Sequence, residues 1–325
     1  MFHSILKRTL VAAATALALI AAGAQAQAPV KLRVSTIPII DTAPLQAAIA
    51  KGFFTEQGLE VDTTPTAGGA VGLPALAAGQ VQVTFSNIIS IILGAKEGLG
   101  FQIIAAGSGT SDTAPDLAGM VTKKGANLKT GKDFEGKRIA VNTRNNIIWL
   151  YARAWVQATG GNPDRVTYLE VPFPQMVDAV RGDRVDGAFV VEPFLSAGLN
   201  GGLELVGWPY NTVQKRIPVG QYAASRTFIA ANPGVIERFV RGYNKVADWI
   251  NQNKGSEEWL KIVSGYTRLA PEQLKNLSLP LFEKMVDPAG VEQVVVQMRK
   301  QGMLEAREVI DVKGLLYRTS TEVVK

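Results

Sequence analysis

The sequence contains no cysteine and only one histidine, His3, in 325 residues. The lack of cysteine excludes disulfides, thiolate metal sites and a cysteine nucleophile. His3 lies in an N-terminal segment that we expect to be removed, so the rest of the chain has no histidine. Ser-His-Asp and Cys-His arrangements, histidine general bases and imidazole-bound zinc or copper are therefore excluded. We expect no catalytic residues, no metal, no cofactor and no enzymatic activity.

The sequence also lacks an apolar run long enough to span a membrane. Lys7 and Arg8 precede the apolar stretch 10–22, and Ala24-Gln25-Ala26 is a small-x-small cleavage motif. The stretch is shorter than the ~20 apolar residues of a spanning helix. We therefore predict a signal peptide over residues 1–26, export to the periplasm, and a mature chain without membrane insertion.

Clustered positive charge is absent as well. The formal net charge is +6, but the basic residues are spread along the chain with no block of five or more. This distribution lacks the clustered basic patch that is typical of nucleic-acid-binding proteins. The length is sufficient for two domains of ordinary size, each with its own core.

Strands and helices are predicted to alternate over residues 133–199. A short β-prone run over 138–141 leads into the polar loop 142–146, and apolar residues then recur at helical spacing up to Gly160-Gly161. A strand over 166–170, a helix over 173–181 and a strand over 185–190 follow. This alternation is typical of βαβ units with a parallel sheet, in which ligands bind beyond the carboxyl ends of the strands.

Residues 31–106 repeat the same order of strand, polar or glycine-rich loop and helix. Two stretches without periodicity, 107–116 and 208–218, lie on either side of the block described above. In addition, segments 73–87 and 176–193 share one order: a helix ending at glycine, a valine-containing strand and a polar turn. We therefore expect an α/β protein with two lobes of similar build, and helices from residue 227 onward.

Several motifs together resemble the periplasmic solute-binding proteins of ABC transporters. They are RVSTIPIIDTAPLQAAIAKGFFTEQGLEV (33–61), ALAAGQVQVTFSN (75–87), GKRIAVNT (136–143), VPFPQM (171–176) and GDRVDGAFVVEPF (182–194). The pattern is similar to the nitrate/sulfonate/taurine (NitT/TauT) branch and to the thiamine-pyrimidine-synthesis proteins. The resemblance implies a type II periplasmic binding fold, with two α/β lobes, a two-strand hinge and a ligand cleft between them. Such a receptor delivers its ligand to an ABC permease in the inner membrane.

The resemblance also implies domain boundaries and ligand contacts. Lobe 1 would comprise residues 27–113 and 222–325, and lobe 2 residues 114–221. The implied ligand contacts of lobe 1 are Ser35, Thr36, Ile37, Asp41, Thr42, Gly68, Gly69, Ala70, Ser86 and Asn87. Those of lobe 2 are Asn142, Thr143, Arg144, Asn145, Phe173 and Glu192.

Each of these residues has a structural alternative. Gly68-Gly69 can serve only as a turn, Ser86-Asn87 as a helix cap, and Phe173 as a core residue. Asp41 can be a solvated loop charge. Glu192 can cap a helix N-terminus, where a negative charge is favourable.

Arg144 is the only cation in the predicted cleft loops, and it favours an anionic ligand. A guanidinium can hold a carboxylate or sulfonate through two parallel hydrogen bonds. The alternative is that Arg144 points to solvent or pairs with an acid. We expect a monomeric receptor for a small organic solute, such as a sulfonate or an aromatic carboxylate. A sensor acting through a separate partner, or an enzyme on the same fold, is the alternative.

Overall fold

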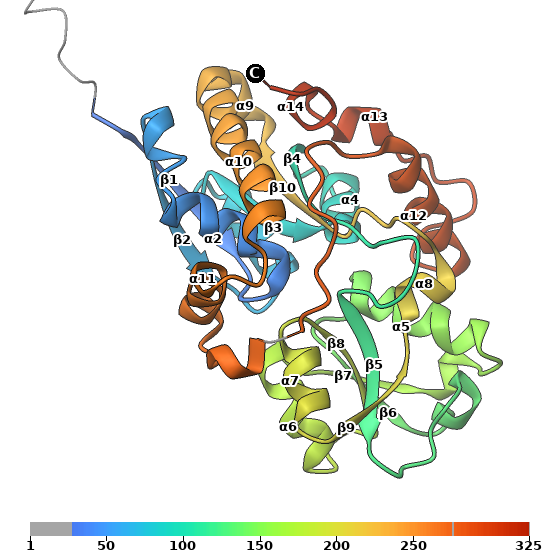
Figure 1. The fold of residues 1–325 in the computed structure, drawn as a ribbon. Helices are drawn as coiled ribbons and strands as arrows, with labels where there is room; N and C mark the ends of the chain where they lie inside the picture. Colours follow the sequence, from blue (N-terminus) through green and yellow to red (C-terminus); the bar gives the residue numbers. More distant parts are fainter. Residues whose placement is uncertain (1–27, 275, 325) are drawn as a thin grey trace, which may run out of the picture.

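A computed structural model describes residues 28–274 and 276–324 (Figure 1). The predicted signal peptide lies outside the described residues. Within the described part of the chain, no helix is both long and apolar enough to cross a membrane.

The described residues form two five-stranded sheets with helices packed on them. The strands are β1 (Val30–Thr36), β2 (Leu59–Pro65), β3 (Val83–Asn87), β4 (Phe101–Ser108), β5 (Ala118–Lys123), β6 (Arg138–Val141), β7 (Thr167–Glu170), β8 (Gly187–Val191), β9 (Leu203–Gly207) and β10 (Gly220–Ser225). The α-helices are α2 (Ala43–Ala50), α3 (Gly69–Ala77), α4 (Ile88–Lys96), α5 (Ile147–Ala158), α6 (Phe173–Arg181), α7 (Phe194–Asn200), α8 (Pro209–Val213), α9 (Arg226–Ala231), α10 (Pro233–Asn253), α11 (Glu257–Thr267), α12 (Pro288–Lys300), α13 (Val312–Leu315) and α14 (Arg318–Thr321). Short 3-10 helices are η1 (Ile40–Thr42), η2 (Thr55–Gln57), η3 (Gly131–Phe134), η4 (Pro163–Arg165) and η5 (Pro271–Leu274).

The two sheets have matching strand orders, β2-β1-β3-β10-β4 in the first and β7-β6-β8-β5-β9 in the second. The similar segments 73–87 and 176–193 supply β3 and β8, which occupy the same third position of their sheets. The expectation of two lobes of similar build is thereby confirmed.

The expectation of parallel sheets is only partly right, because each sheet is mixed. Strands β1, β2 and β3 are parallel, and so are β6, β7 and β8. In contrast, β10 is antiparallel to β3 and β4, and β5 is antiparallel to β8 and β9. Both β5 and β10 follow a segment that crosses from the other lobe, so each begins beside the carboxyl end of its neighbour: Ala118 pairs with Val191, and Gly220 with Asn87.

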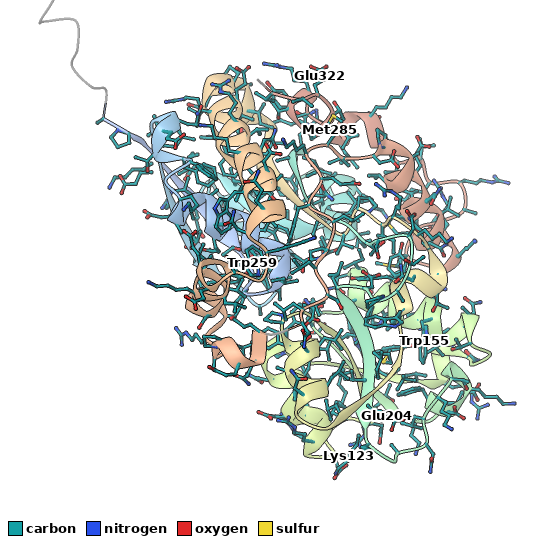
Figure 2. The ribbon with its side chains drawn as sticks, viewed as in Figure 1. Lys123, Trp155, Glu204, Trp259, Met285 and Glu322 are labelled. Atoms are coloured by element: carbon teal, nitrogen blue, oxygen red, sulfur yellow. The ribbon has the colours of Figure 1, made fainter. Side chains whose placement is uncertain are left out.

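Each sheet is covered by helices on both faces (Figure 1). In the first lobe α3 and α4 pack against β3, and α10 and α11 lie over α2. In the second lobe α6 and α7 cover β8, and α5 packs on α8. Trp155 in α5 and Trp259 in α11 are large buried side chains of the second and first lobe, as Figure 2 shows.

Two crossing segments, residues 109–117 and 208–219, connect the sheets and hydrogen-bond to each other. The amide of Thr110 donates to the carbonyl of Ile217 at 3.0 Å, and the amide of Ile217 donates to Thr110 Oγ1 at 2.8 Å. A third segment lies alongside, because Gly109 and Leu281 exchange backbone hydrogen bonds of 2.9 and 2.8 Å. The first sheet takes its strands from 30–108 and 220–225, and the second from 118–207. The finer domain boundaries stay a prediction.

Candidate functional site

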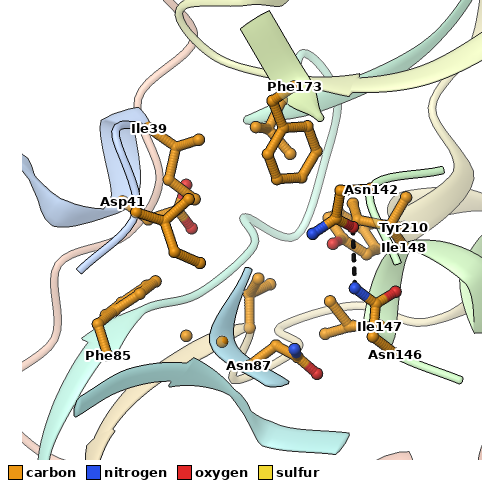
Figure 3. Close-up of a pocket in the computed structure, with 15 residues that line it drawn as sticks. Ile39, Asp41, Phe85, Asn87, Asn142, Asn146, Ile147, Ile148, Phe173 and Tyr210 are labelled. Carbon is orange, nitrogen blue, oxygen red and sulfur yellow. Dashed lines mark hydrogen bonds between the residues drawn. The ribbon is translucent and has the colours of Figure 1, made fainter. Parts of the chain in front are cut away.

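A small cavity lies between the lobes, where the carboxyl ends of strands from both sheets meet (Figure 3). Its volume is about 30 Å³, which accommodates one or two water molecules. A larger solute therefore enters only if the lobes move apart. The lining residues are Ile37, Ile39, Asp41, Gly69, Phe85, Asn87, Asn142, Asn146, Ile147, Ile148, Phe173, Val191, Tyr210, Val219 and Gly220.

Asp41 is the only acidic residue in this lining, and no lysine or arginine accompanies it. It belongs to η1, which follows the carboxyl end of β1 after a short loop. Thr42 holds this loop, because its hydroxyl donates to the carbonyls of Ile37 and Ile39 at 2.7 and 3.0 Å. The loop thereby presents the Asp41 carboxylate and Ile39 toward Asn142 and Tyr210, as Figure 3 shows.

The Asp41 carboxylate is only half satisfied. The side chain is 1% exposed, and Oδ1 accepts a hydrogen bond of 2.5 Å from Ser108 Oγ. Oδ2 is buried without a partner. Among the described residues, no ion pair includes Asp41. Burial therefore raises the pKa of Asp41 to about 6, although the bond from Ser108 opposes the rise.

A second buried carboxyl, Asp116, lies close to Asp41 at the end of the first crossing segment. It is 2% exposed; its Oδ1 accepts from the amide of Leu117 at 2.7 Å, and its Oδ2 has no partner. Burial raises the pKa of Asp116 to about 7, and the negative charge of Asp41 adds to the rise. Negative charge therefore accumulates at this end of the cleft, although Asp116 does not line the cavity itself.

Three asparagines supply amide groups on the opposite and lower walls of the cavity. Asn87 caps α4, where its Oδ1 accepts from the amide of Ser90 at 3.0 Å. Asn146 caps α5 through a 3.1 Å bond from the amide of Trp149. Its Nδ2 donates to Asn142 Oδ1 at 2.8 Å (dashed in Figure 3). These bonds fix the orientation of Asn146 and Asn142 and place both at the start of α5.

Glycine is required where α3 meets β3. A Cβ on Gly69 would lie 2.3 Å from Ser86 Oγ and 2.6 Å from Ser86 Cα, far inside contact distance. The start of α3 can therefore approach the end of β3 only with glycine at this position, and this approach brings both elements to the cavity. Gly68 lies at the rim, where a Cβ would be 3.1 Å from both Asn142 Nδ2 and Thr143 Oγ1.

The structure brings six of the sequence-predicted contacts into the lining and leaves ten outside it. The six are Ile37, Asp41, Gly69, Asn87, Asn142 and Phe173. The ten are Ser35, Thr36, Thr42, Gly68, Ala70, Ser86, Thr143, Arg144, Asn145 and Glu192. Of these ten, Ser35, Thr36, Thr42, Ser86 and Glu192 are buried behind the lining. The contacts to a ligand stay predictions for all sixteen residues.

Arg144 is exposed and lies outside the cavity lining. Its guanidinium donates to the carbonyl of Tyr168 through Nη2 at 2.8 Å and Nε at 3.3 Å. Its backbone amide donates to Glu170 Oε1 at 2.6 Å. The side chain is therefore engaged at the end of β7, and the expected cation of the cleft is not at the cavity.

Glu192 has the structural role that we named as its alternative. It is 1% exposed, and it accepts hydrogen bonds from Ser196 N at 2.9 Å, Ser196 Oγ at 2.7 Å and Ser278 N at 3.0 Å. Burial raises its pKa, and these three bonds oppose the rise. Glu192 thus caps α7 and attaches the segment after η5 to the second lobe.

Tyr210, Phe85 and Val219 are among the lining residues that were not predicted as contacts. Phe85 lies inside β3 and has the pattern of a core residue. Tyr210 belongs to the short helix α8 and Val219 precedes β10, both near the stretch 208–218 that we expected to be irregular. The Tyr210 hydroxyl is buried without a partner. A signal for Tyr210 existed only in its being an aromatic residue between two predicted lobes.

The two lobes and the cavity between them have the fold of periplasmic binding proteins. The alkanesulfonate-binding protein SsuA of Xanthomonas axonopodis pv. citri has the same fold, with a TM-score of 0.75 at 15% identity over 90% of this chain and 99% of that chain. The periplasmic nitrate-binding protein NrtA of Synechocystis PCC 6803 gives a TM-score of 0.72 at 17% identity, over 88% of this chain and 85% of that chain. The NMT1/THI5 like family model matches residues 39–255, and the chain belongs to this family.

Curated relatives are named as binding proteins for nitrate or nitrite and for bicarbonate. The nitrate/nitrite binding protein NrtA of Nostoc sp. is 24% identical over 251 residues, which are 72% of this chain and 57% of that protein. The bicarbonate-binding protein CmpA of Synechococcus sp. is 23% identical over 278 residues, 75% of this chain and 59% of that protein. This chain therefore spans less than two thirds of the length of these relatives. The expected solute-binding family is confirmed.

Proposed function

We propose that this chain is a periplasmic receptor that captures a small organic solute between its lobes and delivers it to an ABC permease. The observation that carries the proposal is the cavity at the strand ends of both sheets, lined by residues from each lobe. Closure of two lobes around a solute removes it from water, and a hinge of two crossing segments permits such closure. The binding-protein names of the relatives support the same role.

We propose no catalytic step for this site. The lining contains one carboxyl group, Asp41, and no lysine, histidine, cysteine or serine. Asp116, the nearest second acid, does not line the cavity, so a pair of carboxyls flanking a substrate is not available. Binding without chemistry is the simplest use of these residues.

The chemistry of the lining supports a ligand different from the organic anion expected from Arg144. Apolar and aromatic side chains such as Ile37, Ile148, Phe85 and Phe173 make up most of the surface. The polar groups are three amides, the Tyr210 hydroxyl and the Asp41 carboxylate. A solute with an apolar body and hydrogen-bonding ends fits these groups, and a free anion would meet Asp41 without a compensating side-chain cation.

Ligand binding can be tested on exported protein purified from the periplasmic fraction. We expect that one class in a thermal-shift panel of amines, amino acids, pyrimidines, carboxylates, sulfonates, nitrate and bicarbonate stabilises the fold, by about 2.7 kcal/mol at a hundredfold excess over Kd. Asn142→Leu should abolish the shift, and Gln293→Leu on the exposed face of α12 should preserve it. Small-angle scattering should give a smaller radius of gyration with that ligand.

Delivery to a permease needs a separate measurement. Deletion of the gene should abolish uptake of the labelled ligand by the source cells. Unchanged uptake, with binding intact, would favour the alternative of a sensor that acts through another protein. A panel in which no solute of any class stabilises the protein would contradict the receptor proposal itself.

A further inference from the structure

The cavity contains a negative charge without a positive partner. The Asp41 carboxylate lines the cavity, is 1% exposed, and leaves Oδ2 without a hydrogen bond. Ser108 satisfies only the other oxygen. A buried ionised group normally has a counter-charge and a full set of hydrogen bonds, because its desolvation is otherwise uncompensated. The missing partner atom must be a donor, and its place is inside the cavity.

The groups around Asp41 do not supply this donor. The ionisable groups that act on it or respond to its charge are Asp116, Tyr210, Tyr222, Tyr243 and Tyr266. Asp116 is a second acid, and burial raises the pKa of each of the four tyrosines, which keeps them neutral. Together, these groups favour a positive charge in the cavity.

The walls of the cavity distinguish an organic cation from a metal ion. A metal such as Ca²⁺ takes six to eight oxygen ligands, whereas most of this lining is apolar. Among the described residues, no group of three or more acidic, histidine or cysteine side chains could hold a metal. Phe85, Phe173 and Tyr210 line the cavity, and aromatic rings attract organic cations.

We propose that the ligand carries a protonated nitrogen, as in an amine or amidine, and that this nitrogen binds Asp41 Oδ2 in the cavity. The proposal rests on the receptor function argued above and specifies its solute class. The N–H group completes the hydrogen bonding of Asp41, and its charge offsets that of the carboxylate. The apolar body of the ligand contacts the aromatic and isoleucine side chains. Its far end meets the amides of Asn142 and Asn146.

Matched pairs of probes test this proposal. Each pair contains one amine from the panel and its hydroxyl or N-acetylated counterpart; both counterparts lack the basic nitrogen, and the hydroxyl form also matches the amine in size. We expect the binding class to contain the amine member and to exclude its counterpart. Asp41→Asn keeps the size of the side chain and an acceptor for Ser108, and it should weaken amine binding about 30-fold or more, because the charge loses its partner.

The pH dependence provides an independent readout. The protonated amine binds the ionised carboxylate, so affinity measured by calorimetry should be highest at pH values above the pKa of Asp41 and below the pKa of the amine. It should fall as the pH decreases through about 6, where free Asp41 takes up a proton. Asp41→Asn should remove the part of this dependence that belongs to Asp41, and the nearby Asp116, with a pKa of about 7, accounts for what is left. A structural role of Asp41 would not produce the part that Asp41→Asn removes.

The possible outcomes separate this proposal from the receptor function. Stabilisation by anions or neutral solutes, with unchanged affinity in Asp41→Asn, would overturn the amine proposal and leave the receptor function intact. Equal binding of an amine and its acetylated counterpart would do the same. Stabilisation by a metal ion alone would also overturn it. If no solute of any class stabilises the protein, the receptor function fails and the amine proposal fails with it.

Discussion

Two buried acids on opposite sides of the cleft, Asp41 in the first lobe and Glu192 in the second, have similar surroundings but different hydrogen bonding. Each follows the carboxyl end of a strand of its own sheet, and each is 1% exposed. The loops touch, because the amide of Ile40 donates to the carbonyl of Glu192 at 2.9 Å. Glu192 accepts three hydrogen bonds, whereas Asp41 accepts one from a side chain and leaves Oδ2 free.

The difference separates a structural acid from a functional one. The donors of Glu192 come from α7 and from the segment after η5, so its charge stabilises local structure. Asp41 lines the cavity and its Oδ2 is buried without a partner, so its desolvation is uncompensated within the protein. Groups that reduce stability in this way are typical of binding sites, where the ligand completes them.

Removing the carboxyl group of Glu192 should have the largest effect on stability. Glu192→Ala leaves Ser196 N, Ser196 Oγ and Ser278 N without their acceptor, at a cost of about 3 to 5 kcal/mol in the free energy of unfolding. Urea denaturation measures this loss. Glu204→Ala, an exposed glutamate of the same lobe, is the control, with an expected change within about 0.5 kcal/mol. A loss below 1 kcal/mol for Glu192→Ala would contradict the structural role.

The sequence predicted most elements of the first sheet and of β6 to β8, because each alternates with a helix and ends at glycine or a polar turn. It could not give the direction of β5 and β10. The direction of these strands depends on where the chain crosses between lobes, which no local pattern encodes. β9, α7 and α8 were also absent from the predictions, since they are short and lie near a stretch rich in proline and glycine.

The sequence located the loops of the cavity but not the orientation of their side chains. The loop 142–146 meets the cavity, as expected, yet it places Asn142 inside and Arg144 outside. Asn145 has a φ of 55°, in the left-handed region, so the chain turns sharply between them. The alternative role of Asp41 was that of a solvated charge on a loop. Only the tertiary structure reveals that this side chain is buried without a cation beside it. Such features depend on packing between distant segments.

Neutralising Asp41 should stabilise the protein, in contrast to neutralising Glu192. The pKa of Asp41 is raised to about 6 from 3.8, so the folded state binds more protons than the unfolded state between these values. The wild-type protein therefore loses stability as the pH rises from about 4 to 6. Asp41→Asn lacks this loss, and at pH 8 without ligand it should be more stable by about 2 to 3 kcal/mol.

Denaturation at two pH values tests the sign of this effect. The gain of Asp41→Asn should be complete at pH 8 and nearly absent below pH 4, where Asp41 is protonated in both states. Asp116 titrates in both proteins, but its pKa should be lower in Asp41→Asn, because the charge of Asp41 that raises it is gone. A variant less stable than the wild type at pH 8 would show that Asp41 is a structural acid like Glu192.

A pair of neighbouring tyrosines extends the same comparison to neutral groups. Tyr151 and Tyr210 pack edge to face with ring centroids 5.2 Å apart. The Tyr151 hydroxyl donates to Gln214 Oε1 at 2.8 Å, whereas the Tyr210 hydroxyl is buried without a partner and lines the cavity. Tyr151→Phe should cost about 1 kcal/mol and Tyr210→Phe about none, as measured by thermal unfolding without ligand. A larger loss for Tyr210→Phe would mean that its hydroxyl stabilises the fold.

Replacing Arg144 should have the smallest effect of these changes. It tests whether the ligand binds the guanidinium of Arg144, as expected from the sequence, or the carboxylate of Asp41, which lines the cavity. The Arg144 side chain is exposed and bound to a backbone carbonyl at the end of β7, so Arg144→Ala should change stability by less than about 0.5 kcal/mol. The affinity of the Arg144→Ala variant for the ligand should stay within about threefold of that of the wild type, a difference in binding free energy of under 1 kcal/mol. Calorimetry with the same ligand on Arg144→Ala and Asp41→Asn provides the direct comparison. A large loss in Arg144→Ala, with little change in Asp41→Asn, would mean that Arg144 turns into the cleft on binding and holds an anion there.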